Sequence, residues 1–260
     1  MAGKARRTAS AAQLEMSDNA LRVKAWMVHQ MLCEEYRCPI RYFHDMDPVS
    51  ELASSLLSHR TRNADSGRAF KTLRARFDSW EAVRDAQTSD VEQAIAAVTW
   101  PEQKAPRIQH VLREIARRHG ELSLDFLADL SVAEARQWLQ ELPGVGPKTS
   151  AATLLFSRLR MPALPVDSHH HRVAQRLGLI PETLGVGPSH AVLEAQLAAG
   201  LTPQQVYDNH EVLMLHGQHC CYYRGPACGR CVVYALCPTG QRLHPELAID
   251  GDPTAHPRSA

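Results

Sequence analysis

The sequence predicts an all-α fold, and three observations lead to this prediction. Apolar residues recur at helical spacing along most of the 260-residue chain, most clearly at Ile108, Val111, Leu112 and Ile115. Capping-box signatures, which mark helix starts, occur at Ser89, Ser131 and Thr202. Alternation of the kind expected for strands is missing, apart from a brief extended piece at residues 162–166. A chain of this length can bury one large core or two modest ones.

Helices are expected along most of the chain, between two irregular ends. Residues 1–18 are small, basic and polar, and we expect a disordered arm there. A first helix covers about 19–36, and Asp47 and Pro48 supply the N-cap and first-turn proline of the next. Residues 241–260 contain prolines and acidic residues, which is typical of a flexible tail. Further amphipathic helices are expected near 66–77, 79–86, 89–98, 104–119, 131–142, 149–160, 168–177, 188–198 and 202–216.

Overall charge does not indicate a class of partner, because the formal net charge is only +1. Basic residues are dense in residues 60–76 and 104–118, although solvated helix faces have the same composition. No apolar run is long enough to cross a membrane, and residues 1–18 lack the apolar segment of a secretion signal. We therefore expect a soluble intracellular protein.

The stretch from Leu142 to Thr149, with the sequence LPGVGPKT, predicts a tight turn between two helices. A proline ends the first helix, and Gly144 and Gly146 allow conformations and close approaches that a side chain would prevent. Thr149 begins the second helix, whose N-terminal N–H groups form a phosphate site that reads no base sequence. An ordinary corner between two helices, with no ligand, remains the alternative.

Two charged residues, Lys148 and Asp167, point to chemistry at this turn. A lysine at a helix start opposes the helix dipole, so its presence suggests a DNA phosphate contact or a nucleophilic amine with a lowered pKa. A solvated surface lysine is the alternative. Asp167 precedes an apolar helical pattern and is also a candidate N-cap. Capping and catalysis are compatible, because a capped carboxylate stays ionised and fixed in position.

Cysteines near the C-terminus indicate a metal site. Four of the seven cysteines lie within seventeen residues, at Cys221, Cys228, Cys231 and Cys237. So dense a group in a chain without a secretion signal favours metal binding over disulfides. Only one C-x2-C knuckle is present, which favours a [4Fe–4S] cluster over a zinc ion, although zinc remains open. Cys220 competes with its neighbour as a ligand, and Cys33 and Cys38 are expected to be ordinary buried thiols.

Together these motifs resemble the endonuclease III family of helix-hairpin-helix DNA glycosylases. The hairpin at 142–149, the run PVDSH at 165–169 and the four-cysteine loop occur in the family's order, within residues 20–240. The resemblance implies a continuous six-helix domain at 50–160 and a cluster domain built from 19–49 and 161–240. It implies that Lys148 is the amine nucleophile and Asp167 the catalytic carboxylate. It also implies that the cluster is [4Fe–4S], with Cys221, Cys228, Cys231 and Cys237 as its ligands.

The resemblance further implies a bifunctional DNA glycosylase and AP lyase of base excision repair. Such an enzyme excises oxidised pyrimidines through a lysine Schiff base and cuts the strand by β-elimination. Its partner is double-stranded DNA with a damaged base or abasic site, bound by a monomer in the cytoplasm at the nucleoid. Contacts with DNA are then expected from the hairpin residues Gly144, Gly146 and Thr149, from Arg60, Trp100 and Lys104, and from Arg224 and Arg230 in the cysteine loop.

The sequence departs from the family at two positions. Arg60 stands where the family has a glutamine that fills the gap left by the flipped nucleotide. Trp100 replaces a residue of the wedge loop before Lys104, and it is either an unstacking wedge or a packed core residue. Two other functions remain as alternatives: a monofunctional glycosylase for mismatched adenine, thymine or uracil, and a non-catalytic cluster-bearing DNA-binding protein. The second has no need for Lys148 and Asp167 together.

Overall fold

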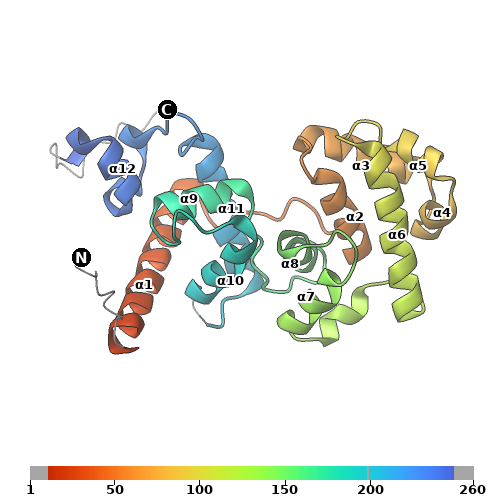
Figure 1. Ribbon diagram of the computed structural model, residues 1–260, viewed down its shortest axis with the longest axis horizontal. Coiled ribbons are helices and arrows are strands. Elements are labelled where there is room, and N and C mark those ends of the chain that lie inside the picture. The colour runs from red at the N-terminus through yellow and green to blue at the C-terminus, as the bar shows by residue number, and fades with distance from the viewer. Residues whose placement is uncertain (1–10, 198, 249–260) are drawn as a thin grey trace, which may run out of the picture. The chain divides into compact units, whose positions relative to one another are not determined.

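The computed structural model describes residues 11–197 and 199–248, and within these ranges the chain forms helices and no strand (Figure 1). The predicted all-α class is therefore confirmed. The α-helices are α1 (Ala11–Tyr36), α2 (Pro48–Ser58), α3 (Asn63–Arg76), α4 (Trp80–Asp85), α5 (Thr88–Ala94), α6 (Pro101–His119), α7 (Val132–Gln140), α8 (Pro147–Phe156), α9 (Ser168–Arg176), α10 (Val186–Gln196), α11 (Pro203–His219) and α12 (Pro238–Leu243). Short 3-10 helices are η1 (Asp125–Asp129), η2 (Cys228–Arg230), η3 (Tyr234–Leu236) and η4 (Pro245–Ala248).

The chain divides into two compact units. Among the described residues, the first contains 11–40, 166–197, 199–201 and 208–248, and the second contains 41–165 and 202–207. The predicted domains placed residues 41–49 and 161–165 with the cluster domain, whereas both segments lie in the second unit.

The two predicted terminal segments differ from the structure where it describes them. Helix α1 begins at Ala11 and so includes part of the predicted N-terminal arm, whose residues 1–10 lie outside the described part. The predicted C-terminal tail begins inside α12 and continues into η4, and residues 249–260 lie outside the described part.

The core of the second unit is built on the apolar stripe of α6. Ile108, Val111, Leu112 and Ile115 are each at most 2% exposed and belong to one hydrophobic cluster with side chains from α2, α7 and α8. Burying an aliphatic side chain of this kind contributes about 1.5–3 kcal/mol, so the stripe alone orients α6. This core supports the hairpin between α7 and α8.

Helix starts follow the predicted capping signals at two of three positions. Ser131 and Glu134 form a reciprocal capping box, and the Thr202 hydroxyl accepts a hydrogen bond from the Gln205 N–H. The prediction at Ser89 was wrong, because α5 begins at Thr88 and no side chain caps it. A polar residue at capping-box spacing therefore does not fix the start of a helix when the residue before it can also join the helix.

The first unit packs α1, α9, α10 and α12 around a smaller core. α10 contacts both α1 and α9, and α12 contacts α9. Val28 and Leu32 of α1, Val173 of α9 and Leu193 of α10 are almost fully buried. This packing fixes the start of α9, where Asp167 lies. Among the described residues, no helix is long and apolar enough to cross a membrane.

Candidate active site and metal centre

The predicted hairpin is present between α7 and α8. Leu142 and Val145 are buried and anchor the turn, and the Val145 N–H donates to the Leu142 carbonyl. Gly144 has φ +80°, and a Cβ built on it would lie 2.8 Å from the Arg107 Cδ. Gly146 differs, because its φ is −99° and the space around it is open. A side chain at Gly144 would therefore strain the left-handed backbone and displace the Arg107 side chain. Neither constraint applies at Gly146.

Lys148 lies in the first turn of α8, which begins at Pro147 rather than at the predicted Thr149. Its side chain is half-buried. The first N–H groups of a helix have no acceptor inside the helix and form the positive end of its dipole. The helix dipole therefore opposes a cation in this turn. The lowered pKa of Lys148 stays a prediction.

His59 was not identified from the sequence, yet it lies beside this helix start. Its Nε2 is 2.9 Å from the Thr149 Oγ1. Burial first, then the positive charges of Lys148 and Lys104, lower the pKa of His59 to about 4. The imidazole is therefore neutral at physiological pH and adds no positive charge next to Lys148. Nothing in the sequence predicts this contact, because His59 directly follows α2 and reaches α8 only through the packing of the core.

Asp167 is the N-cap of α9, as its position before an apolar pattern predicted. Its Oδ1 accepts a hydrogen bond of 2.7 Å from the His170 N–H. Burial would raise the pKa of Asp167, but positive charge at His210 and the hydrogen bond from His170 outweigh burial, so the pKa lies below its ordinary value. The carboxylate is therefore ionised and fixed in direction.

A second buried carboxyl, Glu211 of α11, lies near Asp167 and was also missed. Burial first, then the negative charges of Asp167 and Asp208, raise the pKa of Glu211 to about 7. Fully buried His170 lies beside it on α9, with its pKa lowered to about 3 by burial and by His210. Of the pair Asp167 and Glu211, Asp167 therefore loses its proton first.

Lys104 does not present its amine to solvent. The side chain is only 5% exposed, and Nζ donates to the Leu57 carbonyl (2.7 Å), the His59 carbonyl (2.8 Å) and the Thr61 Oγ1 (2.8 Å). The Thr61 Oγ1 also accepts from the Thr99 N–H. Lys104 therefore ties the loop after α2 to the loop before α6. This structural role differs from the predicted DNA contact, because three acceptors already occupy the ammonium.

The two loops that Lys104 joins present Arg60 and Trp100. Both residues have left-handed backbones, with φ +50° and φ +57°, which is uncommon for residues with large side chains. The Arg60 guanidinium carbon lies 5.9 Å from the centre of the Trp100 ring. Trp100 is 44% exposed, so the alternative of a packed core tryptophan is wrong. The strained loops hold a flat cation and an aromatic ring together at the surface.

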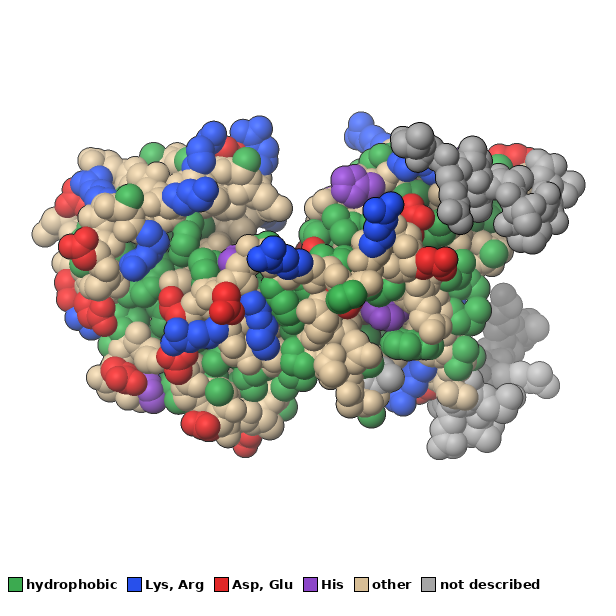
Figure 2. All heavy atoms as spheres, turned by 180° about the vertical axis from the view of Figure 1, so that it is seen from behind, with side chains coloured by type: hydrophobic (Ala, Val, Ile, Leu, Met, Phe, Trp, Pro, Cys, Tyr) green, Lys and Arg blue, Asp and Glu red, His purple; other side chains and the backbone are tan. Residues whose placement is uncertain are grey.

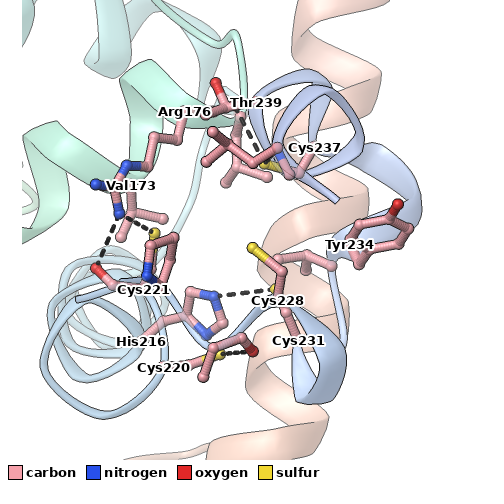
Figure 3. A pocket seen from close by; sticks show the side chains of 16 residues that line it. Val173, Arg176, His216, Cys220, Cys221, Cys228, Cys231, Tyr234, Cys237 and Thr239 are labelled. Carbon is pink, nitrogen blue, oxygen red and sulfur yellow. Dashed lines mark hydrogen bonds between the residues drawn. The ribbon is translucent and has the colours of Figure 1, made fainter. Parts of the chain in front are cut away.

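The predicted metal ligands gather around one pocket in the first unit (Figure 3). Cysteine residues that line it are Cys220, Cys221, Cys228, Cys231 and Cys237. Arg176 Nη1 lies 3.3 Å from the Cys221 Sγ, and the Gly240 N–H donates to the Cys237 Sγ at 3.2 Å. His216, Cys220 and Cys231 offer ligand atoms within 4.8 Å of one another. The cysteines thus line one pocket, with N–H donors near the Cys221 and Cys237 sulfurs. Of the four predicted ligands, only Cys231 belongs to the group within 4.8 Å.

Two findings bear on the remaining cysteine predictions. Cys220 is buried and lines the same pocket as Cys221, so the choice between these neighbours stays a prediction. Cys33 and Cys38 were predicted to be free thiols, and this was wrong, because they form a disulfide. The backbone explains the pairing: Arg37 has φ +62°, and the Cys38 N–H donates to the Cys33 carbonyl, so the chain turns back over the end of α1.

Charged side chains form no single positive surface on the face drawn in Figure 2, where acidic side chains lie among the lysines and arginines. The predicted basic region at 60–76 is partly neutralised, because Arg62 and Arg68 pair with Asp65 and Arg76 pairs with Asp90. Arg224 and Arg230 of the cysteine loop are exposed.

A family model, described as HhH-GPD superfamily base excision DNA repair protein, matches residues 53–201. This range is more than half of the chain and includes both the hairpin and the start of α9. The chain therefore belongs to the HhH-GPD superfamily of base excision DNA repair proteins.

Individual relatives agree with this assignment. A "Putative DNA glycosylase" of Arabidopsis thaliana is 33% identical over 169 residues, which cover 65% of this chain and 56% of the plant protein. This chain thus spans just over half the length of that relative. Endonuclease III of Escherichia coli K12 is 29% identical over 197 residues, covering 75% of this chain and 86% of the bacterial protein.

Solved structures show the same fold. A trapped covalent intermediate of endonuclease III with DNA has a TM-score of 0.71 at 21% identity and covers 85% of this chain and 98% of its own. A thermostable thymine-DNA glycosylase has a TM-score of 0.72 at 20% identity and covers 86% and 99%.

Proposed function

We propose that the protein is a bifunctional DNA glycosylase and AP lyase of base excision repair that removes oxidised pyrimidines from double-stranded DNA. It would act as a monomer in the cytoplasm, at the nucleoid. The observation that carries this proposal is Lys148 in the first turn of α8, at the positive end of the helix and beside a neutral His59. The ionised N-cap Asp167 supports it, because the reaction develops positive charge on the sugar.

The reaction would begin by extrusion of the damaged nucleotide, since C1′ of its sugar is out of reach inside the duplex. Lys148, as the free amine, attacks C1′, and the bond to the base breaks with its electron pair on the base. Asp167 stabilises the positive charge on the sugar and accepts the proton that the attacking amine loses. The sugar ring then opens to a Schiff base, loss of the C2′ proton follows, and the 3′ phosphate leaves.

The surfaces around the hairpin would hold the DNA. The α8 N-terminus with Gly144, Gly146 and Thr149 would bind a phosphate without reading sequence. Arg60 and Trp100 would fill the gap that the extruded nucleotide leaves in the duplex, because a flat cation and an aromatic ring can both stack on bases. Lys104 would hold in place the two loops that carry Arg60 and Trp100.

We also propose that Cys221, Cys228, Cys231 and Cys237 hold a [4Fe–4S] cluster. These four residues line one pocket, and cysteine sulfur is the donor that iron–sulfur clusters require. When bound, the cluster supplies a rigid cross-link for residues 221–237. Arg224 and Arg230 would then face DNA phosphate. Every chemical step above uses only the chain's own side chains.

A second candidate substrate is a mismatched thymine or uracil. The observation that favours it is the similarity of the fold to a thymine-DNA glycosylase. Both candidates share Asp167, and they differ in whether Lys148 forms a covalent intermediate.

Borohydride trapping on abasic-site DNA tests the proposal. Wild-type protein should become covalently linked to the DNA, and Lys148→Gln should lose the adduct while still binding the same DNA. The matched control is Lys71→Gln, an exposed lysine of α3, which should trap as wild type does. Equal trapping by Lys148→Gln would refute the lyase, and base release from a mismatch without trapping would favour the second candidate.

A further inference from the structure

A second group of potential metal ligands lies where the end of α1 meets α11. His29 and Cys33 are four residues apart on α1, so their side chains lie on the same helix face. Ligand atoms of Cys33, Cys38 and Asp208 lie within 4.8 Å of one another. The His29 Nε2 lies 3.7 Å from the Cys33 Sγ. Two sulfurs and one carboxylate therefore lie together, and one imidazole lies beside the Cys33 sulfur.

Contacts behind the ligands hold two of them in place. The Asp208 Oδ1 accepts a hydrogen bond of 2.8 Å from the Ile40 N–H. The His29 Nδ1 lies 3.4 Å from the Asn209 side-chain amide, which leaves Nε2 directed at the sulfur. The amide can present either its oxygen or its nitrogen, so its oxygen can accept a hydrogen bond from the Nδ1–H group when Nε2 binds a metal. Such supporting contacts are typical of metal sites, where they orient the ligands.

Two of the ligands lie in a protected place. His29 is 6% exposed and Asp208 is 5% exposed, so a carboxylate and an imidazole are both shielded from bulk water. A metal ion bound there would meet little competition from water.

We propose that reduction of the Cys33–Cys38 disulfide creates a zinc site with His29, Cys33, Cys38 and Asp208 as its four ligands. A dithiol reductant gives two electrons and two protons to the disulfide and itself becomes a disulfide. Zn²⁺ then replaces the two thiol protons and binds the carboxylate and the neutral imidazole. Zinc fits this donor set, because it accepts sulfur, nitrogen and oxygen ligands in a tetrahedron and needs no redox change.

The two states would hold the fold differently. The disulfide links Cys38 only to α1, whereas zinc would also link both cysteines to α11 through Asp208. A reducing environment favours the zinc form, and oxidation would release the ion. This inference does not depend on whether the chain is a glycosylase.

Zinc K-edge X-ray absorption on the full, iron-loaded protein tests the proposal. The protein is reduced with dithiothreitol, incubated with one equivalent of Zn²⁺ and desalted. We expect one zinc per chain, with two sulfurs at about 2.3 Å and two nitrogen or oxygen atoms at about 2.0–2.1 Å. A shell of four sulfurs would place zinc in the 221–237 loop and would overturn the proposal, as would protein that retains no zinc.

Two variants and a control locate the ion. Cys33→Ser with Cys38→Ser should abolish zinc retention, and Asp208→Asn should weaken zinc affinity at least about tenfold while keeping an acceptor for the Ile40 N–H. Glu35→Gln, an exposed acid on the same turn of α1, should retain zinc as wild type does. Full zinc retention by the double serine variant would contradict the proposal. If that variant does not fold, the wild-type absorption spectrum still decides.

Discussion

The starts of α8 and α9 carry opposite charges, and the difference separates a stabilising feature from a costly one. Asp167 places an anion at the N-terminus of α9 and caps its backbone, which the helix dipole favours. Lys148 places a cation in the first turn of α8, where no side chain caps the helix and the dipole opposes the charge. The fold explains Asp167 without a function, whereas Lys148 is better explained by chemistry.

The largest expected effect comes from Asp167→Asn. Asparagine caps helices about as well as aspartate, so the fold and the start of α9 should be retained. Loss of the negative charge should slow base release about 10²–10⁴-fold, because electrostatic and proton-transfer catalysis are of this size. Single-turnover release of an oxidised pyrimidine measures the effect, with Asp129→Asn at an exposed position as control. A wild-type rate would show that Asp167 serves only as a cap.

The surroundings of Asp167 should also show in the pH dependence of stability. Glu211 has a folded pKa of about 7, above its ordinary value of 4.5, so its stabilising effect is present below pH 4.5 and lost as pH rises through 7. The loss should be roughly 3 kcal/mol. Urea unfolding of wild type and Glu211→Gln is compared from pH 4.5 to 8. The difference between the two curves isolates the contribution of Glu211 from those of His59 and His170, whose lowered pKa values make stability rise with pH. Parallel curves would mean that Glu211 is not perturbed.

At the hairpin, Gly144→Ala should destabilise the fold by about 1–3 kcal/mol, because alanine is strained at φ +80° and its Cβ meets Arg107. Gly146→Ala is the matched control and should change the free energy of unfolding by less than about 0.5 kcal/mol, since its backbone is extended and its surroundings are open. Thermal unfolding of the pair measures both effects. Equal losses would show that the turn needs both glycines and would contradict the geometry described above.

The smallest expected effect is a gain. Lys148→Gln should raise the free energy of unfolding by about 0.3–1 kcal/mol, because it removes a cation from a helix N-terminus. Lys71→Gln, within α3, should leave stability almost unchanged. Chemical denaturation at low salt measures the difference. A stability loss in Lys148→Gln would remove the contrast between the two helix starts.

Local features of this molecule could be predicted from the sequence. The apolar stripe of α6, the Ser131 capping box, the Asp167 cap and the turn at Gly144 depend on residues a few positions apart, so their spacing reveals them. His59 beside Lys148, Glu211 beside Asp167 and the buried ammonium of Lys104 depend on packing between distant segments. The Cys33–Cys38 pairing depends on a left-handed backbone at Arg37. Arginine rarely adopts this conformation, so the residues between the two cysteines do not predict the turn.

The most direct test of the account is the identity of the residue that joins the DNA. Wild-type protein is trapped on abasic-site DNA with borohydride, digested, and the cross-linked peptide is sequenced by mass spectrometry. A reduced sugar adduct is expected on Lys148 alone. An adduct on Lys104, on another lysine or on the N-terminal amine would contradict it.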